Sequence, residues 1–230
     1  MVRLLVPDEI RLACLTLVPS AMAVPVRRQA LPSSLRDIDP DMVIVAGPGL
    51  GDPIRQRSLV RRLWSLPNRL VLDGTGLEAL AALPSLKARS APTVLTPHPG
   101  EFRRLARGWS LPNTMGDHSM TAARTLARRC GATVVLKSHR TCIADPHRHA
   151  INDTGGPVLA IPGSGDVLAG MIGGLMCQGM RAFDAARLAA YLHGRAGETW
   201  ASRHGQVGML AMELAVLIPA ELERYRRAAR

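Results

Sequence analysis

Hydrophobic and polar positions along the chain alternate between short apolar runs and longer amphipathic segments. The apolar runs predict strands at Val2–Val6, Met42–Ala46, Arg69–Asp73, Thr93–Thr96, Thr133–Lys137, Thr141–Ala144 and Ala150–Asn152. Helical spacing predicts helices at Ile54–Trp64, Gly76–Ala82, Glu101–Ala106, Ser119–Cys130, Asp166–Gln178, Ala182–Arg203 and Met209–Arg227. Strands that alternate with helices and are apolar throughout indicate a parallel sheet covered on both faces. We therefore expect one α/β domain over residues 1–230.

The composition favours a globular protein with an aliphatic core. Of the 230 residues, 47% are hydrophobic and 20% are charged, which excludes a disordered chain. No apolar run reaches the length of a membrane span, and the first residues lack the apolar region of a signal peptide. The four cysteines, Cys14, Cys130, Cys142 and Cys177, form no CxxC pair. Reduced thiols, a cytoplasmic location and no membrane partner are the resulting expectations.

The chain is strongly basic, with 29 Lys and Arg against 18 Asp and Glu and a formal net charge of +11. Only Lys87 and Lys137 are lysines, and the arginines are spread thinly along the chain. No dense basic arm or aromatic stacking platform accompanies them. We therefore expect no nucleic-acid partner, and a diffuse positive field of this kind suits small phosphorylated molecules.

The strongest motif is Gly163-Ser164-Gly165-Asp166, a tight glycine turn that opens into an apolar helix. Glycines let backbone N–H groups converge, and the helix N-terminus adds partial positive charge, so the turn suits a phosphate. A carboxylate at this place would repel that anion unless it acts on a neighbouring group. Asp166 is therefore a candidate to accept the proton of a hydroxyl awaiting phosphoryl transfer. The alternative is that Asp166 caps the helix.

A second motif, Lys137-Ser138-His139-Arg140-Thr141, follows a hydrophobic strand. Lys137 would point into the crevice beyond the strand ends, where ligands of such sheets bind. The turn after it can line the phosphates or ribose of a nucleotide. The alternative is a charged hairpin tip.

Three further motifs lie at predicted strand ends. His98, bracketed by Pro97 and Pro99, is either a substrate contact or part of a turn that starts a helix at Glu101. Asp73 either orients a substrate hydroxyl or a metal-bound water, or caps the next helix. The loop Gly47–Gly51 allows close approach to a ligand or is a plain turn, and its spacing is not GxGxxG.

Neither His193 nor His98 predicts a metal site. His193 lies among small residues in an apolar helix and is best interpreted as a satisfied core histidine. No second ligand follows His98 at helical spacing, so we expect no metal held by the protein itself.

The order of these motifs resembles the ADP/ATP-dependent NAD(P)H-hydrate dehydratases. The resemblance runs from about Val2 to the final helix and implies a three-layer ribokinase-like fold. It also implies repair of hydrated NADH or NADPH (NADHX or NADPHX), driven by ADP or ATP with Mg²⁺ through transient phosphorylation of the substrate hydroxyl. The motifs that carry it are Gly-Pro-Gly-Leu-Gly, Leu-Asp-Gly-Thr-Gly-Leu, Leu-Thr-Pro-His-Pro-Gly-Glu-Phe, Leu-Lys-Ser-His-Arg-Thr, Gly-Ser-Gly-Asp-Val-Leu-Ala-Gly and His-Gly-Arg-Ala-Gly.

The resemblance also implies roles for individual residues. Asp166 is similar to the family's catalytic residue at the substrate hydroxyl. The matched positions of the adenine-nucleotide site are Lys137, Ser138, His139, Arg140, Thr141, Gly163, Ser164 and Gly165. Those of the substrate site are Gly49, Gly51, Asp73, His98 and Asp166.

Two departures from the family pattern qualify these expectations. The sequence starts near the family's Val-Pro-Glu position, here Val6-Pro7-Asp8, without the usual preceding strand and helix. We expect a shortened domain with one open flank, which association into a homo-oligomer would cover. In addition, Thr75 replaces a family carboxylate. The alternatives are a ribokinase-like kinase for a small metabolite, and a nucleotide-binding protein without turnover.

Overall fold

A computed structural model describes residues 1–26, 35, 38–51, 53–83, 87–112 and 116–228 of the chain. The chain divides into two compact units, Met1–Pro40 and Asp41–Arg230, and each is described by itself. The expectation of a single domain over the whole chain stays a prediction.

The first unit is a βαβ segment. Strands β1 (Arg3–Pro7) and β2 (Met22–Val26) pair in parallel and are joined by helix α1 (Asp8–Leu17). The sequence predicted β1 but missed α1 and β2. Apolar residues in α1 do not follow a clean helical stripe, and none of its residues is buried. Pro25 lies inside β2, and proline weakens a strand prediction.

The second unit is built on a six-stranded sheet in the order β3-β4-β5-β6-β7-β8. Strands β3 to β6 are parallel, whereas β7 and β8 continue the sheet in antiparallel fashion. Every strand predicted between residues 42 and 152 is present. Their bounds are β3 (Val43–Ala46), β4 (Arg69–Leu72), β5 (Thr93–Leu95), β6 (Thr133–Leu136), β7 (Thr141–Ala144) and β8 (His149–Asn152).

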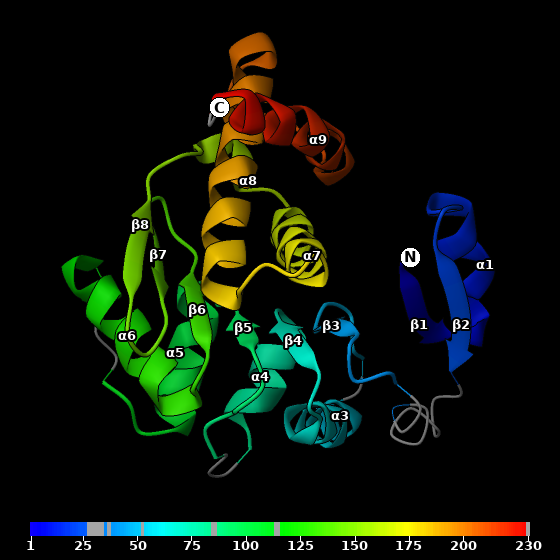
Figure 1. The fold of residues 1–230 in the computed structure, drawn as a ribbon, viewed down its shortest axis with the longest axis vertical. Coiled ribbons are helices and arrows are strands. Elements are labelled where there is room, and N and C mark those ends of the chain that lie inside the picture. Colours follow the sequence, from blue (N-terminus) through cyan, green and yellow to red (C-terminus); the bar gives the residue numbers. More distant parts are fainter. Residues whose placement is uncertain (27–34, 36–37, 52, 84–86, 113–115, 229–230) are drawn as a thin grey trace. The chain divides into compact units, whose positions relative to one another are not determined.

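Helices cover both faces of this sheet, as Figure 1 shows: α7 and α8 on one side, and α3 to α6 on the other. The helices are α3 (Pro53–Ser65), α4 (Thr75–Ala81), α5 (Pro99–Gly108), α6 (Ser119–Cys130), α7 (Ser164–Cys177), α8 (Ala182–His204) and α9 (Ala211–Ala228). Two short 3₁₀ turns, Gly116–His118 and Pro157–Leu159, complete the unit. The expected three-layer α/β fold is confirmed.

One core lies between the sheet and the pair α7 and α8. Val71, Val94 and Val135, one from each of the three central parallel strands, are buried there against residues such as Ile172 and Phe183. The side chains of β4 to β6 are almost all buried, as expected for strands covered on both faces. The carboxyl ends of these strands are thereby fixed side by side.

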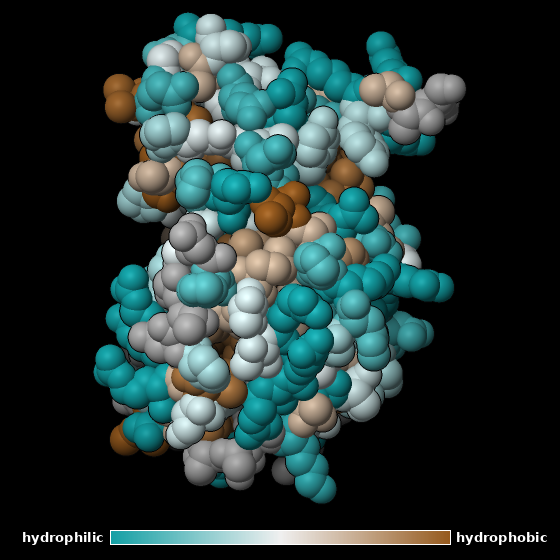
Figure 2. Space-filling view, turned by 90° about the vertical axis from the view of Figure 1, so that its left-hand side faces the viewer, coloured by the Kyte–Doolittle hydropathy of each residue, from teal (hydrophilic) through white to brown (hydrophobic). Residues whose placement is uncertain are grey.

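One face of the molecule is mainly polar. Figure 2 shows a face on which hydrophilic side chains predominate and hydrophobic ones form small areas. Within the described part of the chain, no helix is both long and apolar enough to cross a membrane.

Candidate functional site

A buried ion pair lies at the carboxyl ends of β4 and β6. The Lys137 Nζ atom is 2.8 Å from Asp73 Oδ1, and only 3% of the Asp73 side chain is exposed. Asp73 does not cap the next helix, because α4 begins after Gly74 without a side-chain cap. Lys137 is likewise no free hairpin tip, since 21% of its side chain is exposed. The two strand-end residues singled out in the sequence therefore meet.

A second carboxylate approaches the same lysine. Glu101 Oε2 is 3.9 Å from Lys137 Nζ and accepts a hydrogen bond of 2.7 Å from the backbone N–H of His98. In return, His98 Nδ1 accepts from the N–H groups of Gly100 (3.0 Å) and Glu101 (3.3 Å). This reciprocal capping box starts α5. Sequence reasoning placed Glu101 only at a helix start. The three-residue spacing between His98 and Glu101 is a sequence signal for the capping box. Nothing in the local sequence indicates that Glu101 also approaches Lys137.

The environment shifts the pKa of both capping residues. Burial raises the pKa of Glu101, and the positive charge of Lys137 opposes this shift. Burial also lowers the pKa of His98, helped by the charges of Lys137 and Arg104. Because Nδ1 accepts two hydrogen bonds, neutral His98 carries its proton on Nε2. This Nε2–H group lies 3.5 Å from Glu101 Oε1, and because the His98 side chain is half exposed it is also accessible to a ligand.

The glycine turn at the start of α7 lies against this ion pair. Gly163 adopts a left-handed conformation (φ +83°) as the N-cap of the helix. A Cβ atom on Gly165 would lie 3.2 Å from Lys137 Nζ and 3.3 Å from Asp73 Oδ2. The absence of a side chain at Gly165 thus lets the lysine approach the backbone N–H groups of the helix start. This combination suits an anion.

Asp166 is a candidate base beside the turn. It does not cap α7, because Gly163 is the N-cap and no side-chain cap is formed. Within the described part of the chain, the Asp166 carboxylate has no hydrogen bond or ion pair, and the residue is exposed. Its pKa is raised by partial burial and by the negative charge of Asp73, whereas Lys137 lowers it. A free carboxylate of raised pKa is suited to accept a proton.

The glycine loop after β3 packs against the same strand end. A Cβ atom on Gly47 (φ +139°) would lie 1.7 Å from the Asp73 carbonyl oxygen, so only glycine fits. Thr75 Oγ1 donates to the Gly47 carbonyl at 2.5 Å and accepts from the Leu50 N–H at 3.4 Å. Thr75 therefore holds this loop. Gly49 and Gly51 also have positive φ and open space around them, and their contact with a substrate stays a prediction.

The turn between β6 and β7 uses two of its hydroxyls internally. Thr141 Oγ1 donates to the Ser138 carbonyl at 3.0 Å, and Ser138 Oγ donates to the Arg140 carbonyl at 2.8 Å. His139 and Arg140 are exposed, and their side chains form no hydrogen bond or ion pair with any described residue. These two side chains are the ones in the turn that remain free for a ligand.

His193 is a satisfied core histidine, as expected. The residue is 8% exposed. Its Nε2 atom lies 3.1 Å from Ser164 Oγ and 3.0 Å from the Ser164 carbonyl oxygen. Ser164, predicted as a nucleotide contact, therefore has its hydroxyl close to the protein interior.

The structure brings together residues far apart in sequence: Asp73, His98, Glu101, Lys137, Gly165 and Asp166. Among the described residues, no group of three or more His, Cys, Asp or Glu side chains forms a metal-binding cluster. The arrangement offers an anion-binding turn, one fixed cation, an imidazole N–H and a free carboxylate. Such a set suits transfer of a phosphoryl group to a hydroxyl.

The chain is similar in sequence to known proteins. Residues 1–220 match the family model described as NAD(P)H-hydrate dehydratase. The bifunctional NAD(P)H-hydrate repair enzyme of Gloeobacter violaceus is 44% identical over 187 residues, which are 80% of this chain and 35% of that protein. The chain thus spans about a third of the length of the curated relatives it matches.

Solved structures show the same fold. The ADP/ATP-dependent NAD(P)H-hydrate dehydratase from Bacillus subtilis, co-crystallised with ATP and Mg²⁺, matches with a TM-score of 0.82 and 29% identity, covering 95% of this chain and 77% of that one. A ribokinase-like superfamily protein from Enterococcus faecalis matches with a TM-score of 0.77 and 24% identity, over 97% of this chain and 76% of that one. The expected ribokinase-like fold is therefore confirmed. With nearly its whole length matched by the family model, the chain belongs to the NAD(P)H-hydrate dehydratase family.

Proposed function

We propose that the protein uses ADP or ATP to dehydrate hydrated NADH or NADPH, and so restores the reduced nicotinamide cofactor. The observation that carries this proposal is the Asp166 carboxylate, which has no partner among the described residues. It lies next to the Lys137–Asp73 ion pair and the glycine turn of α7. Membership of the family and the names of the relatives support the choice of substrate.

In the first step the terminal phosphoryl group of the nucleotide moves to the substrate hydroxyl. Asp166 accepts the hydroxyl proton, the substrate oxygen forms a bond to phosphorus, and the bond from phosphorus to the nucleotide breaks. The N–H groups at the start of α7 and the Lys137 ammonium stabilise the charge on the transferring oxygens. Asp73 and Glu101 hold that ammonium in place.

In the second step the substrate loses inorganic phosphate. The carbon–oxygen bond breaks and the oxygen leaves with the phosphate. The neighbouring carbon gives up a proton to water or to the departing phosphate, and the electron pair of that C–H bond forms the ring double bond. Phosphate is a far better leaving group than hydroxide, which explains why a nucleotide is consumed. In this proposal His98, with its proton on Nε2, donates to an oxygen of the substrate.

The nucleotide site comprises the turn of α7 and the free side chains of the β6–β7 turn, His139 and Arg140. Support comes from the Bacillus subtilis relative, which was co-crystallised with ATP and Mg²⁺. Asp73 and Glu101 are engaged by Lys137, and the described residues form no metal-binding cluster. These residues would suit a Mg²⁺ ion held mainly by the phosphates of the nucleotide. The ion supplies charge neutralisation.

The activity is tested by mixing the purified protein with NADHX or NADPHX and either ADP or ATP. We expect the near-ultraviolet absorbance of NAD(P)H to return. Asp166→Asn should abolish turnover while nucleotide binding, followed by thermal shift, is kept. Glu223→Gln, which alters an exposed acid on α9, is the control and should behave like the unaltered protein.

Two other outcomes would redirect the assignment. A stable phosphorylated product from another hydroxylated metabolite would indicate a ribokinase-like kinase, which needs the same base. Nucleotide binding without turnover of any hydrate would indicate a non-catalytic protein. Full activity of Asp166→Asn would remove Asp166 from the mechanism.

We also propose that the protein is a cytoplasmic homo-oligomer. Strand β3 ends the six-stranded sheet, and Val45 within it is 43% exposed, so a second copy could cover this edge. All four cysteines are free thiols, which suits a reducing compartment. Light scattering on the purified protein measures the mass, and a monomer at all concentrations would contradict the first part. Cell fractionation tests the second.

A further inference from the structure

The His193–Gly197 segment of α8, singled out in the sequence, has no role in the chemistry proposed above. In the structure it supports the loop that leads into the glycine turn of α7. A Cβ atom on Gly194 would lie 2.1 Å from Thr154 Oγ1, and one on Gly197 would lie 2.8 Å from Leu159 Cδ2. The loop therefore rests directly on the backbone of α8. Gly194 is required for that contact, because a Cβ there would also lie 2.6 Å from the backbone of Thr154.

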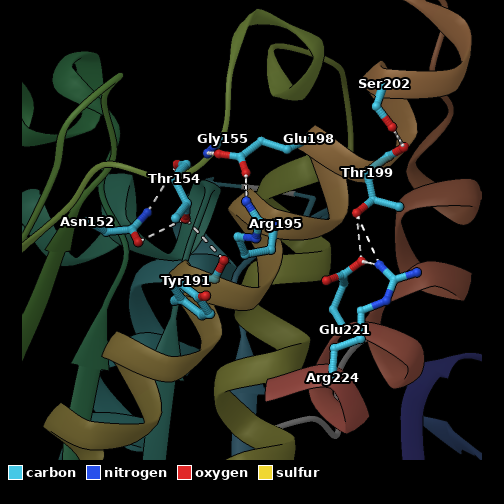
Figure 3. A network of polar contacts seen from close by, with 10 residues as sticks. All are labelled: Asn152, Thr154, Gly155, Tyr191, Arg195, Glu198, Thr199, Ser202, Glu221 and Arg224. Carbon is cyan, nitrogen blue, oxygen red and sulfur yellow. Dashed lines mark hydrogen bonds and ion pairs between the residues drawn. The ribbon is translucent and has the colours of Figure 1, made fainter. Parts of the chain in front are cut away.

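Polar contacts tie the beginning of the same loop to α8, as Figure 3 shows. The Gly155 N–H donates to Glu198 Oε1 at 2.8 Å, and Arg195 holds the other oxygen of Glu198. Thr154 Oγ1 lies 3.1 Å from the Tyr191 carbonyl oxygen. The loop is thereby fixed at its start.

His193 fixes the end of the loop, where the glycine turn begins. A carbonyl oxygen can only accept, so the 3.0 Å contact with Ser164 requires a proton on His193 Nε2. The Ser164 hydroxyl oxygen, 3.1 Å from the same Nε2 atom, then also accepts, and its own proton is left for another acceptor. One buried imidazole thus restrains both the backbone and the side chain of Ser164.

We propose that His193 is a positioning residue for the phosphoryl-transfer site: through Ser164 it holds the Gly163–Asp166 turn against the Lys137–Asp73 ion pair. Ser164 immediately precedes Gly165, whose backbone faces Lys137 Nζ and Asp73 Oδ2. A small rotation at Ser164 would move the N–H groups of the turn and the Asp166 carboxylate together. His193 touches neither nucleotide nor substrate in this proposal, which rests on the proposed function.

The test compares two substitutions with a matched control. His193→Gln keeps an N–H near the Nε2 position, whereas His193→Leu removes it. Phe183→Leu alters a core residue at the start of the same helix, among the residues that pack on the sheet, and controls for lost stability. We expect His193→Leu to lower kcat/KM about tenfold or more at a temperature where it is fully folded. His193→Gln should recover most of the loss, and Phe183→Leu should stay close to the unaltered protein.

A second measurement needs no activity. Amide hydrogen exchange reports the bonds from Ser164 N to the Ile161 carbonyl (3.3 Å) and from Val167 N to the Gly163 carbonyl (3.1 Å). Exchange at these amides should speed up in His193→Leu, be restored in His193→Gln and be unchanged in Phe183→Leu. If His193→Leu does not fold, His193→Gln is compared with Ser164→Ala instead. We then expect slower turnover in Ser164→Ala but not in His193→Gln.

The outcomes separate the two proposals. Unaltered exchange and unaltered kcat/KM in His193→Leu would overturn the positioning role while the proposed function stands. Equal losses in His193→Leu, His193→Gln and Phe183→Leu would show a purely structural histidine and overturn it too. An unaltered protein that neither binds nucleotide nor restores NAD(P)H contradicts the proposed function, and hydrogen exchange still decides whether His193 holds the turn.

Discussion

At the scale of single residues, the site depends on one lysine held between two buried carboxylates. Asp73 contacts Lys137 Nζ at 2.8 Å, and Glu101 lies at 3.9 Å. Both acids are almost fully buried, so each would be costly without its cationic neighbour. The lysine is therefore confined to one place instead of sampling solvent, which prepares it for a phosphoryl group.

The first prediction concerns Asp73→Asn, which leaves the volume of the side chain but removes its charge. Lys137 should lose its fixed position, and kcat/KM should fall on the order of tenfold. Steady-state kinetics measure the effect. Glu78→Gln is the control, because Glu78 forms an ion pair with Arg104 in which both side chains are about half exposed. It should change kcat/KM little, and an equal effect of the two variants would contradict the special role of Asp73.

The second prediction concerns the pH dependence of turnover. Asp166 acts as a base only when deprotonated, and its pKa is raised by partial burial and by Asp73. Activity should therefore be lost on acidification at a pH above the ordinary range of an aspartate. Asp73→Asn removes a negative charge and should shift this acid limb to lower pH. A profile of kcat/KM against pH checks both statements. A shift of the acid limb to higher pH in Asp73→Asn would contradict the second.

At the scale of elements, the N-termini of two helices converge on the lysine. α5 starts with the capping box of His98 and Glu101, and α7 starts with the glycine turn. Each helix directs partial positive charge toward the strand ends. The first N–H groups of α5 are already used by the His98 cap, so the N–H groups at the start of α7 are the ones left for a ligand. The third element is the end of β6, which supplies Lys137. Together they make a place for a highly charged anion.

The third prediction concerns Gly165→Ala. The added Cβ would lie 3.2 Å from Lys137 Nζ and would push the ammonium a few tenths of an ångström away from the helix start. Affinity for nucleotide, measured by calorimetry or thermal shift, should fall several-fold. Gly170→Ala is the matched control on the same helix, since a Cβ there meets nothing within 4 Å. It should keep its affinity and gain up to about 1 kcal/mol of stability from helix propensity.

At the scale of the whole second unit, a buried arginine joins elements on the far side of the sheet from α7 and α8. Arg89 donates to the carbonyls of Leu63 (2.8 Å), Trp64 (3.1 Å) and Leu66 (2.8 Å), and also to that of Asn68. Burial lowers its pKa to about 10, so it stays protonated at neutral pH. These carbonyls close the C-terminal end of α3 and lead into β4, whose far end carries Asp73.

The fourth prediction is that Arg89→Met lowers the free energy of unfolding by about 3 kcal/mol, because several buried carbonyls lose their donor. Chemical denaturation monitored by circular dichroism measures the change. The control is Arg62→Met, which replaces an exposed arginine in the last turn of α3. It should change the free energy of unfolding by less than about 0.5 kcal/mol. Similar values for both variants would contradict the structural role of Arg89.

The local pattern of the sequence determined most of the architecture. Apolar runs such as Val134-Val135-Leu136 and glycine turns such as Gly163–Gly165 indicate strands and helix starts through nearest-neighbour physics alone. The motif order then indicated the family. The sequence did not predict helix α1 and strand β2. Their apolar residues follow neither the helical nor the strand period cleanly, and Pro25 lies within β2.

Only the tertiary structure decided how the candidate residues act. Asp73 and Lys137 lie 64 positions apart and meet because β4 and β6 end at the same edge of one sheet. Glu101 reaches that lysine, Thr75 secures the glycine loop, and His193 reaches Ser164 from another helix. Such contacts depend on the registry of strands and the direction of side chains across elements, which no local pattern encodes. The sequence alone therefore determined the elements and their motifs, whereas packing decided which charges and hydrogen-bonding groups face one another.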